Sequence, residues 1–283
     1  MLSGTVVGDR YQIEKEVGRG ARGVIFKASD SGRSVAVKIL VDDMLNDETA
    51  FDRFTTEAKT ALSLKHPNII DVFDFGLTDD GQAFLVMDYC DGCTLQQVLD
   101  VEKRLNLPRA LNIFLQIVNA LCYAHSKGMI HRDIKPENIV LQNDAKVDQV
   151  KVVDFGIAKK FSLLPGVDLA SEGQALGTPG YMSPEQAMGE RHIDARSDIY
   201  SLGCLMYTTL AGVLPIDGSS AEEILSRHIS VEPVPLSLAC PGALLPANVQ
   251  EVVMRAIKKF PEERYQTAEQ LKSDIKMLIA QLT

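Results

Sequence analysis

Residues 131–138 read His-Arg-Asp-Ile-Lys-Pro-Glu-Asn, and Asp154-Phe155-Gly156 follows sixteen residues after Asn138. The first stretch contains a carboxylate, a lysine ammonium group and an amide oxygen, and the second stretch adds another carboxylate. Carboxylate and amide oxygens bind hard divalent cations, and a carboxylate close to a hydroxyl group can accept its proton. One short region of the chain therefore holds the groups that are needed to move a phosphoryl group.

In order and approximate spacing, these two stretches resemble the catalytic loop and the metal-binding tripeptide of the protein-kinase family. The resemblance covers nearly the whole chain, and residues 177–186 and 197–203 look most like the eukaryotic-type serine/threonine kinases of bacteria. It implies a bilobal α+β fold. A small antiparallel β-sheet lobe with one main helix, residues 1–90, would bind nucleotide, and a larger, mainly helical lobe, residues 91–283, would carry catalysis and substrate binding.

Composition is consistent with a globular enzyme and argues against nucleic-acid binding. The chain has 283 residues, of which 46% are hydrophobic, and a formal net charge of −9. Broad phosphate-binding surfaces need clustered Lys and Arg. We find no apolar run of the roughly 20 residues that cross a membrane and no leader-like N-terminus, and therefore expect a cytoplasmic domain. Relatives frequently continue into a membrane helix, so a longer protein could still be anchored.

Five cysteines without a regular spacing favour a reducing compartment. Cys90 and Cys93 form a C-x-x-C pair, but the second pair that a structural zinc site needs is absent. Ordinary thiols are the favoured interpretation over redox or metal chemistry.

Apolar patterning predicts a sheet followed by helices. We expect strands at residues 11–17, 24–29, 35–40, 69–75 and 83–89, with one amphipathic helix at residues 51–64. Beyond residue 92 the apolar spacing becomes helical. We expect a helix that contains the repeat from Leu111 to Leu121 and is capped by Gly128, and further helices at residues 197–210, 221–229, 248–259 and 268–282.

Three glycines, Gly18, Gly20 and Gly23, form a G-x-G-x-x-G pattern near the N-terminus. Without a Cβ, such a loop lets backbone N–H groups approach phosphate oxygens closely. A dinucleotide-binding fingerprint would require a helix directly after the glycines, whereas Val24-Ile25-Phe26 continues as a strand. The pattern favours the glycine-rich hairpin of kinases, with a plain structural turn as the alternative.

Val35-Ala36-Val37-Lys38 alternates on a strand, which places Ala36 and Lys38 on one face, beneath the glycine loop. By resemblance, Lys38 reaches the α- and β-phosphates of ATP, and Glu57 on the amphipathic helix holds its ammonium group. Each charge alone would be interpreted as a solvated surface residue. Their position between the other motifs favours the paired role.

The adenine site follows from the resemblance alone. Ile25, Ala36, Met87 and Val140 match the apolar positions around the base, and Asp88 to Cys90 match the connecting segment that offers backbone hydrogen bonds. Apolar residues at such positions could equally belong to the core.

A β-hairpin is expected to place the two metal-binding residues side by side. Residues 139–141 and 151–153 can form its strands across a turn region at Asn143 and Asp144. The hairpin brings Asn138 beside Asp154, whose oxygens can bind Mg²⁺ between them, with Mn²⁺ as an alternative metal.

The resemblance assigns the remaining catalytic roles. Asp133 accepts or orients the proton of the attacking hydroxyl group, and Lys135 steadies the phosphate as charge moves to the leaving group. Lys135 and Thr178 both match the serine/threonine class rather than the tyrosine kinases. For His131 and Phe155 we expect packing that aligns the loop rather than chemistry.

Residues 154–185 correspond to the activation segment, which ends in Ser183-Pro184-Glu185, where most relatives have alanine first. By resemblance, Glu185 pairs with Arg264, and Asp198 braces the catalytic loop from the helix behind it. Either charge could otherwise face solvent.

Arg132 is the residue that, in relatives, meets a phosphorylated side chain of the activation loop. The candidates before Thr178 are Ser162 and Ser171. Bacterial relatives often carry a phosphorylated threonine about six residues before this position, where the chain has Glu172. We hypothesise that Glu172 partly replaces that phosphate; an exposed charge in the loop is the alternative.

The sequence therefore predicts an ATP- and magnesium-dependent serine/threonine protein kinase with protein substrates and autophosphorylation, which a homodimer could support. Two alternatives stay open. A pseudokinase scaffold would bind nucleotide or partner proteins without transfer, and a small-molecule phosphotransferase would use the same loop but would not need residues 177–185.

Overall fold

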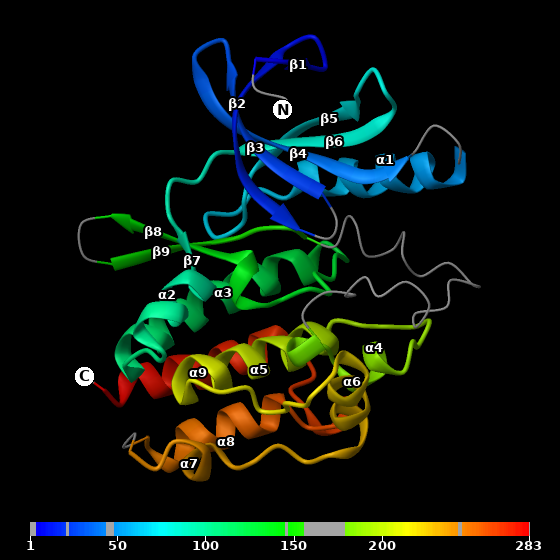
Figure 1. Cartoon of the computed structure of the whole chain (residues 1–283). Helices are drawn as coiled ribbons and strands as arrows, with labels where there is room; N and C mark the ends of the chain where they lie inside the picture. Colours follow the sequence, from blue (N-terminus) through cyan, green and yellow to red (C-terminus); the bar gives the residue numbers. More distant parts are fainter. Residues whose placement is uncertain are drawn as a thin grey trace. The chain divides into compact units, whose positions relative to one another are not determined.

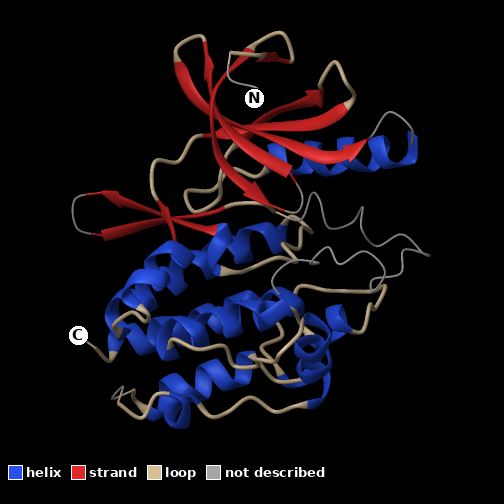
Figure 2. Cartoon of the chain, in the orientation of Figure 1, coloured by secondary structure: helices blue, strands red, loops and turns tan. Residues whose placement is uncertain are grey.

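The computed structural model describes residues 4–20, 23–43, 48–144, 147–155, 179–242 and 245–282. The described residues divide into two compact units, each treated by itself below. The β unit runs to Asp91, and the helical unit comprises Gly92–Phe155 and the described residues from 179 onward. This division lies one residue beyond the predicted boundary at residue 90. The strands of the first unit and the helices of the second are distinguished in Figures 1 and 2.

The β unit contains a six-stranded antiparallel sheet in the order β1-β2-β3-β4-β6-β5. Its strands are β1 (Val6–Val7), β2 (Tyr11–Gly20), β3 (Gly23–Asp30), β4 (Arg33–Asp43), β5 (Val72–Leu77) and β6 (Gln82–Asp88). The five predicted strands are present, most of them longer than predicted, and the short β1 was missed. Pairing with neighbouring strands extends β2, β3 and β4 beyond their apolar residues, whereas β5 begins three residues later than predicted.

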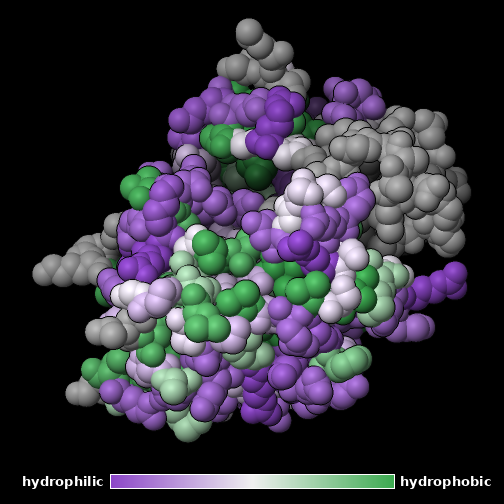
Figure 3. All heavy atoms as spheres, turned by 60° about the horizontal axis from the view of Figure 1, so that its bottom comes forward, coloured by the Kyte–Doolittle hydropathy of each residue, from purple (hydrophilic) through white to green (hydrophobic). Residues whose placement is uncertain are grey.

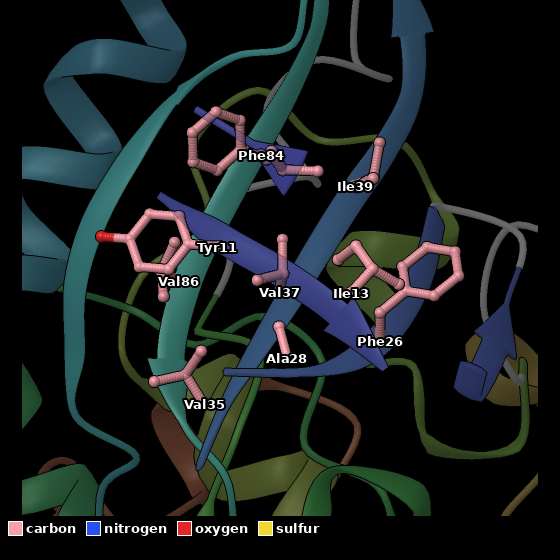
Figure 4. Packing of buried hydrophobic residues seen from close by; sticks show 10 residues of the cluster. Tyr11, Ile13, Phe26, Ala28, Val35, Val37, Ile39, Phe84 and Val86 are labelled. Carbon is pink, nitrogen blue, oxygen red and sulfur yellow. The ribbon is translucent and has the colours of Figure 1, made fainter. Parts of the chain in front are cut away.

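Strict alternation on β4 builds the core of this unit. Val35, Val37 and Ile39 point to one face of the sheet and are buried, while Ala36 and Lys38 occupy the other face. The residues of this core cluster come from five strands, and all of them except Val7 are labelled in Figure 4: Val7, Tyr11, Ile13, Phe26, Ala28, Val35, Val37, Ile39, Phe84 and Val86. Ala36 and Lys38, on the other face of β4, are therefore not part of this core.

Helix α1 (Glu48–Ser63) packs beside β5. Phe54, Ala58 and Ala61 are buried, and the Phe54 ring meets Phe75 edge-on with centroids 5.8 Å apart. This spacing of three and four residues is the predicted apolar stripe.

The helical unit is built around α3 (Leu107–Ser126) and α5 (Arg196–Ala211). Gly128 has a φ of 74°, and the N–H of Met129 donates to the carbonyl of Ala124 at 3.0 Å, so the predicted glycine cap ends α3. In α5, a Cβ at Gly203 would lie 2.6 Å from a side-chain carbon of Ile257, so glycine permits the close approach of α8.

The remaining helices of this unit are short or peripheral. They are α2 (Leu95–Glu102), α4 (Pro184–Ala187), α6 (Ala221–Ser230), α7 (Leu236–Ala239), α8 (Ala247–Ala256) and α9 (Ala268–Ala280), with 3₁₀ turns at Pro136–Asn138, Pro179–Tyr181 and Pro261–Glu263. The sequence prediction missed α2, α4 and α7 and ran α8 three residues too far.

A three-stranded sheet, β7-β8-β9, belongs to the helical unit. It comprises β7 (Cys93–Thr94), β8 (Ile139–Asp144) and β9 (Val147–Val152). The turn predicted at Asn143 and Asp144 is wrong, because these residues pair with Asp148 and Val147 as strand.

Within the described ranges, no helix combines the length and apolarity that a bilayer crossing requires. Large apolar side chains are exposed at scattered positions of the helical unit, such as Leu238 and Phe260. Figure 3 shows hydrophobic residues in separate groups among hydrophilic ones. Scattered exposure of this kind is ordinary for a globular protein.

Candidate active site

The catalytic loop of the helical unit places two polar side chains, Lys135 and Asn138, next to the Asp133 carboxylate. The Nζ atom of Lys135 lies 3.5 Å from Oδ2 of Asp133. The Nδ2 group of Asn138 donates to the same Oδ2 at 3.2 Å and to the backbone carbonyl of Asp133 at 2.8 Å. A carboxylate is thus held between an ammonium group and an amide, in a fixed orientation.

The β8–β9 hairpin places Asn138 and Asp154 at the same end of the sheet. Ile139 pairs with Val152, and the N–H of Val153 donates to the carbonyl of Asn138 at 3.0 Å. Asp154 follows immediately, with a φ of 60°. That left-handed backbone is unusual for a residue other than glycine and is typical of functional sites.

Asn138 and Asp154 offer a donor set that fits Mg²⁺. Because Nδ2 of Asn138 donates to Asp133, the other polar atom of the amide is Oδ1, an oxygen donor. Mg²⁺ takes one or two protein oxygens and completes its shell with water and phosphate oxygens. Among the residues described here, no cluster of three or more His, Cys, Asp and Glu side chains could hold a metal ion by itself. The fit therefore depends on phosphate oxygens from a nucleotide.

Asp198, at the first turn of α5, braces the catalytic loop from behind. Its carboxylate accepts the backbone N–H of His131 at 2.8 Å and that of Arg132 at 2.7 Å, and it lies 2.8 Å from Nε2 of His125. Burial alone would raise the pKa of Asp198, but the hydrogen bond from His125 and the neighbouring imidazoles lower the pKa below its ordinary value. The Asp198 carboxylate is therefore ionised, and it supports the catalytic loop through its hydrogen bonds, as the resemblance predicted.

His131 and Phe155 pack inside the unit, as expected. His131 has no exposed surface, and its ring lies 4.5 Å from the Phe155 ring. The backbone N–H of Asp133 donates to Nδ1 of His131, and Nε2 lies 2.9 Å from the carbonyl of Val153. Burial lowers the pKa of His131, so a neutral imidazole with its proton on Nε2 satisfies both partners.

Gln116, which no sequence motif pointed out, holds the outer edge of β9. Its Nε2 donates to the carbonyl of Asp148 at 2.8 Å, and its Oε1 accepts the N–H of Val150 at 2.9 Å. Arg109 adds two bonds to the Asp148 carboxylate, at 2.7 and 3.1 Å. Helix α3 thereby fixes the hairpin on which Asn138 and Asp154 depend.

Glu185 and Arg264 form the predicted ion pair, with Nη1 2.7 Å from Oε1. Burial would raise the pKa of Glu185, but the hydrogen bonds and the charge of Arg264 hold the pKa below its ordinary value. Arg132, by contrast, is half-buried and has a φ of 65°.

In the β unit, the face opposite the core carries the residues predicted to bind nucleotide. Ile25 pairs with Lys38, which pairs with Leu85, and Ala36 pairs with Met87. Lys38 is 8% exposed. A lysine buried on this face is suited to an anionic ligand and does not behave as a solvated surface charge.

Glu57 lies on α1 between the buried residues Phe54, Ala58 and Ala61, so it shares their face of the helix. Its pairing with Lys38 stays a prediction. The joint use of Lys38 with Asp133 and Asp154 also stays a prediction, because these residues lie in different units.

The glycine pattern lies in the β2–β3 hairpin, and β3 continues through Val24-Ile25-Phe26, so no helix follows the glycines. Among the described residues, none has an atom within 4 Å of a Cβ built at Gly20, whereas a Cβ at Gly23 would lie 2.2 Å from the carbonyl oxygen of Ile39. Gly23 also has a φ of 151°, which only glycine adopts readily. The lack of described atoms close to Gly20 is compatible with close backbone approach of a ligand.

The other predicted nucleotide contacts are distributed over both units. Met87 is buried, and Asp88 forms an ion pair with Arg33 at 2.6 Å. Cys90 is half-buried, and Val140 is a half-buried residue of β8 in the helical unit. The predicted phosphorylation and regulatory positions Ser162, Ser171, Glu172 and Thr178 lie outside the described residues.

Comparisons with known proteins agree with this geometry. The chain matches the model of the protein kinase domain over residues 11–277. It is 40% identical over 276 residues to "Serine/threonine-protein kinase pkn3" of Myxococcus xanthus, which covers 96% of this chain and 50% of that protein. It is 38% identical over 278 residues to "Serine/threonine-protein kinase PrkC" of Bacillus subtilis, covering 98% of this chain and 41% of that protein.

A solved structure of a kinase domain also matches the fold of this chain. The crystal structure of the Mycobacterium tuberculosis PknI kinase domain superposes with a TM-score of 0.77 and 27% identity over 98% of both chains. The chain spans half or less of the length of the two curated relatives named above. On the match of its sequence and its fold, the chain belongs to the protein kinase family.

Proposed function

We propose that this chain is a serine/threonine protein kinase domain that transfers the γ-phosphoryl group of ATP to Ser or Thr hydroxyl groups of proteins. The observation that carries the proposal is the arrangement around Asp133, whose carboxylate contacts both Lys135 and Asn138. The names of the relatives support the same acceptor class.

In this proposal, Asp133 accepts or orients the proton of the acceptor hydroxyl group. The contact with Asn138 fixes the carboxylate, and the Lys135 ammonium group, 3.5 Å from it, also faces the transferring phosphate. Positive charge at that point stabilises the transition state as negative charge moves toward the leaving group. Asp133 thus acts on the acceptor hydroxyl group, and Lys135 acts on the phosphoryl group that is transferred to it.

Asn138 Oδ1 and the Asp154 carboxylate would hold a divalent cation. When bound, Mg²⁺ neutralises the charge of the β- and γ-phosphates and orients them for transfer. The two hard oxygen donors with retained water suit the octahedral shell of Mg²⁺, the proposed metal, and Mn²⁺, which binds the same donors, is the alternative.

Residues of the β unit would bind the nucleotide. Lys38 contacts the α- and β-phosphates and is held by Glu57, while Gly18, Gly20 and the hairpin around Gly23 approach the phosphates with their backbone. Burial of Lys38 supports this assignment, as does the lack of any described atom within 4 Å of a Cβ built at Gly20. The adenine would lie against the apolar side chains of Ile25, Ala36 and Met87 on the same face as Lys38 and of Val140 in the helical unit. The connecting segment, from Asp88 to Cys90, would offer it backbone hydrogen bonds.

Autophosphorylation, in a transient homodimer, and a cytoplasmic location of the domain are part of the proposal. Ser162, Ser171 and Thr178 are the proposed acceptor positions in the activation segment. Glu172 is proposed to replace a phosphate there in part, through attraction to cations such as Arg132.

The test is phosphosite mapping by mass spectrometry after incubation of the chain with Mg²⁺ and ATP, together with a general protein acceptor. We expect phosphoserine or phosphothreonine in the chain and in the acceptor. Asp133→Asn should lower the rate by about 10²–10⁴-fold, because general base catalysis contributes that much. Binding of a fluorescent ATP analogue should be retained. Asp274→Asn, at a carboxylate of α9 that accepts the Tyr265 hydroxyl, is the matched control.

Each other outcome contradicts the proposal. Nucleotide binding without any transfer would make the chain a pseudokinase. Transfer to aminoglycoside-like acceptors but not to protein would make it a small-molecule phosphotransferase. Equal rates for Asp133→Asn and the native chain would remove the assigned base.

A further inference from the structure

Gln186 connects helix α4 to the catalytic loop through its side-chain amide. Its Nε2 donates to the backbone carbonyl of Arg132 at 3.0 Å. Its Oε1 accepts the backbone N–H of Ser183 at 3.1 Å and the Ser183 hydroxyl group at 3.2 Å. Both arms of the amide are therefore used, one toward its own helix and the other toward a residue 54 positions away.

The carbonyl that Gln186 holds belongs to the peptide bond directly before Asp133. The nitrogen of the same peptide, the N–H of Asp133, donates to Nδ1 of His131 at 3.2 Å. Contacts at both its oxygen and its nitrogen fix the plane of this peptide. Because the Cα of Asp133 lies in that plane, the peptide fixes the point from which the Asp133 side chain starts, while Asn138 and Lys135 contact its carboxylate directly.

Arg132 needs such support, because its φ of 65° is unfavourable for a residue with a Cβ. The N–H of Arg132 is held by Asp198 at 2.7 Å, and its carbonyl is held by Gln186 at 3.0 Å. Asp198 is the brace that the resemblance implies. Gln186 is a second support, on the other side of the same residue.

Gln186 can hold the Arg132 carbonyl in place because helix α4 is itself fixed within the helical unit. Its neighbour Glu185 forms the buried ion pair with Arg264, and Ser183 caps the helix with a reciprocal pair of bonds to Gln186. The side chain of Gln186 therefore extends from a fixed base.

We infer that Gln186 is a positioning residue for phosphoryl transfer: its amide holds the Arg132–Asp133 peptide in the orientation that aims Asp133 at the acceptor hydroxyl group. The inference rests on the proposed kinase activity. It adds Gln186, which directly follows the activation segment in sequence and acts on the catalytic loop through the carbonyl of Arg132.

The decisive variant is Gln186→Glu. A carboxylate at this position still accepts from Ser183, so the helix cap stays intact, but it cannot donate to the Arg132 carbonyl and repels it. Gln186→Met removes all three of these side-chain hydrogen bonds at nearly the same side-chain length. Gln270→Glu and Gln270→Met are the matched controls, because Gln270 is an exposed residue of α9 whose side-chain oxygen accepts the N–H of Gln266 within the same unit.

We expect kcat at saturating ATP to fall about 10–100-fold in both Gln186 variants, since small misplacement of a catalytic group costs about this much. The KM for ATP and the binding of a fluorescent ATP analogue should stay within about twofold of the native chain. Thermal midpoints should match those of the Gln270 controls. A merely structural role would instead lower stability and leave the turnover of the folded protein unchanged.

Hydrogen–deuterium exchange gives a readout that does not depend on activity. Peptides covering residues 129–136 should exchange faster in Gln186→Glu than in the native chain and in Gln270→Glu. If the native chain transferred no phosphate while this exchange difference appeared, the kinase proposal would fail and the structural hold would stand. Native kcat in Gln186→Glu, or a loss of activity that follows only the loss of folded protein, would overturn the inference.

Discussion

Arg264 and Glu185 form a two-pronged ion pair inside the helical unit, with Nη1–Oε1 at 2.7 Å and Nη2–Oε2 at 2.8 Å. The Arg264 side chain is fully buried, and the Glu185 side chain is 7% exposed. Arg264 also donates to the backbone carbonyls of Lys258 and Lys259. Desolvation of two charges is offset here by geometry in which nearly every donor has an acceptor.

Glu185→Gln should therefore lower the free energy of unfolding by about 3–5 kcal/mol, because a buried guanidinium group loses its counter-charge. Urea unfolding of the native and variant chains measures this loss. Asp194→Asn is the control, since it breaks an ion pair with Arg196 in which Asp194 is 57% exposed. The control should lose no more than about 1 kcal/mol. Equal losses would show that burial does not determine the strength of the pair.

Asp198→Asn should lower kcat more than it lowers nucleotide affinity. An amide retains one oxygen acceptor, so one of the two backbone N–H groups of His131 and Arg132 would face an NH₂ group. Displacement of the loop should lower kcat by about tenfold or more. Steady-state kinetics with varied ATP measures both constants, and Asp274→Asn serves again as the control. A rise in the KM for ATP without a change in kcat would contradict the bracing role.

Stability should fall as the pH decreases from about 6.5 toward 4, in part through His228. Burial and the nearby Lys259 charge lower the pKa of His228 to about 4, whereas an unfolded histidine titrates near 6.5. Between these values the unfolded chain binds a proton that the folded chain does not, so this contribution is complete above pH 6.5 and is lost at lower pH. The full loss is about 3 kcal/mol.

Urea unfolding of the native chain and His228→Gln at a series of pH values tests this expectation. Glu185 and Asp198, whose pKa values are lowered, add their own loss at more acidic pH, and this loss is common to both chains. The difference between the chains should therefore shrink as the pH falls. His192→Gln, at an exposed histidine, is the control. A difference that does not change with pH would contradict the assignment to His228.

Gly23→Ala should destabilise the β unit, and Gly20→Ala should not. The added methyl group at Gly23 would lie 2.2 Å from the carbonyl oxygen of Ile39 on a backbone with a φ of 151°, whereas a methyl group at Gly20 would meet no described atom within 4 Å. We expect a loss of about 1–3 kcal/mol for Gly23→Ala, the usual cost of such strain. Thermal unfolding of both variants measures the difference, and equal midpoints would show that the hairpin rearranges at no cost.

Motifs with a short, fixed geometry could be predicted from the sequence. The alternation from Val35 to Lys38 fixes which side chains share a face, because a strand has a period of two. The sixteen positions that separate Asn138 from Asp154 in the sequence are enough for one β-hairpin. Such a hairpin brings the two residues to the same end of the sheet, whichever turn connects its strands. The exact turn could not be predicted, because Asn143 and Asp144 favour turns locally but are extended by pairing with β9.

The missed helices α2 and α4 are too short to show an apolar period. Each nevertheless begins with a capping box that the sequence displays, Thr94 with Gln97 and Ser183 with Gln186. The contacts of Gln186 and Gln116 with distant backbone groups could not be predicted, because an amide on a helix carries no sign of the partner that folding brings to it.

Gln116 has one more effect beyond placing the hairpin. Strand β9 is the outermost strand of its sheet, and the amide of Gln116 occupies an outward-facing carbonyl and N–H of that strand as a neighbouring peptide would. Unpaired edges of this kind can recruit a strand from another molecule and start aggregation. A single glutamine therefore occupies the edge of β9 against intermolecular β-pairing at the same place where it holds the hairpin that positions Asn138 and Asp154.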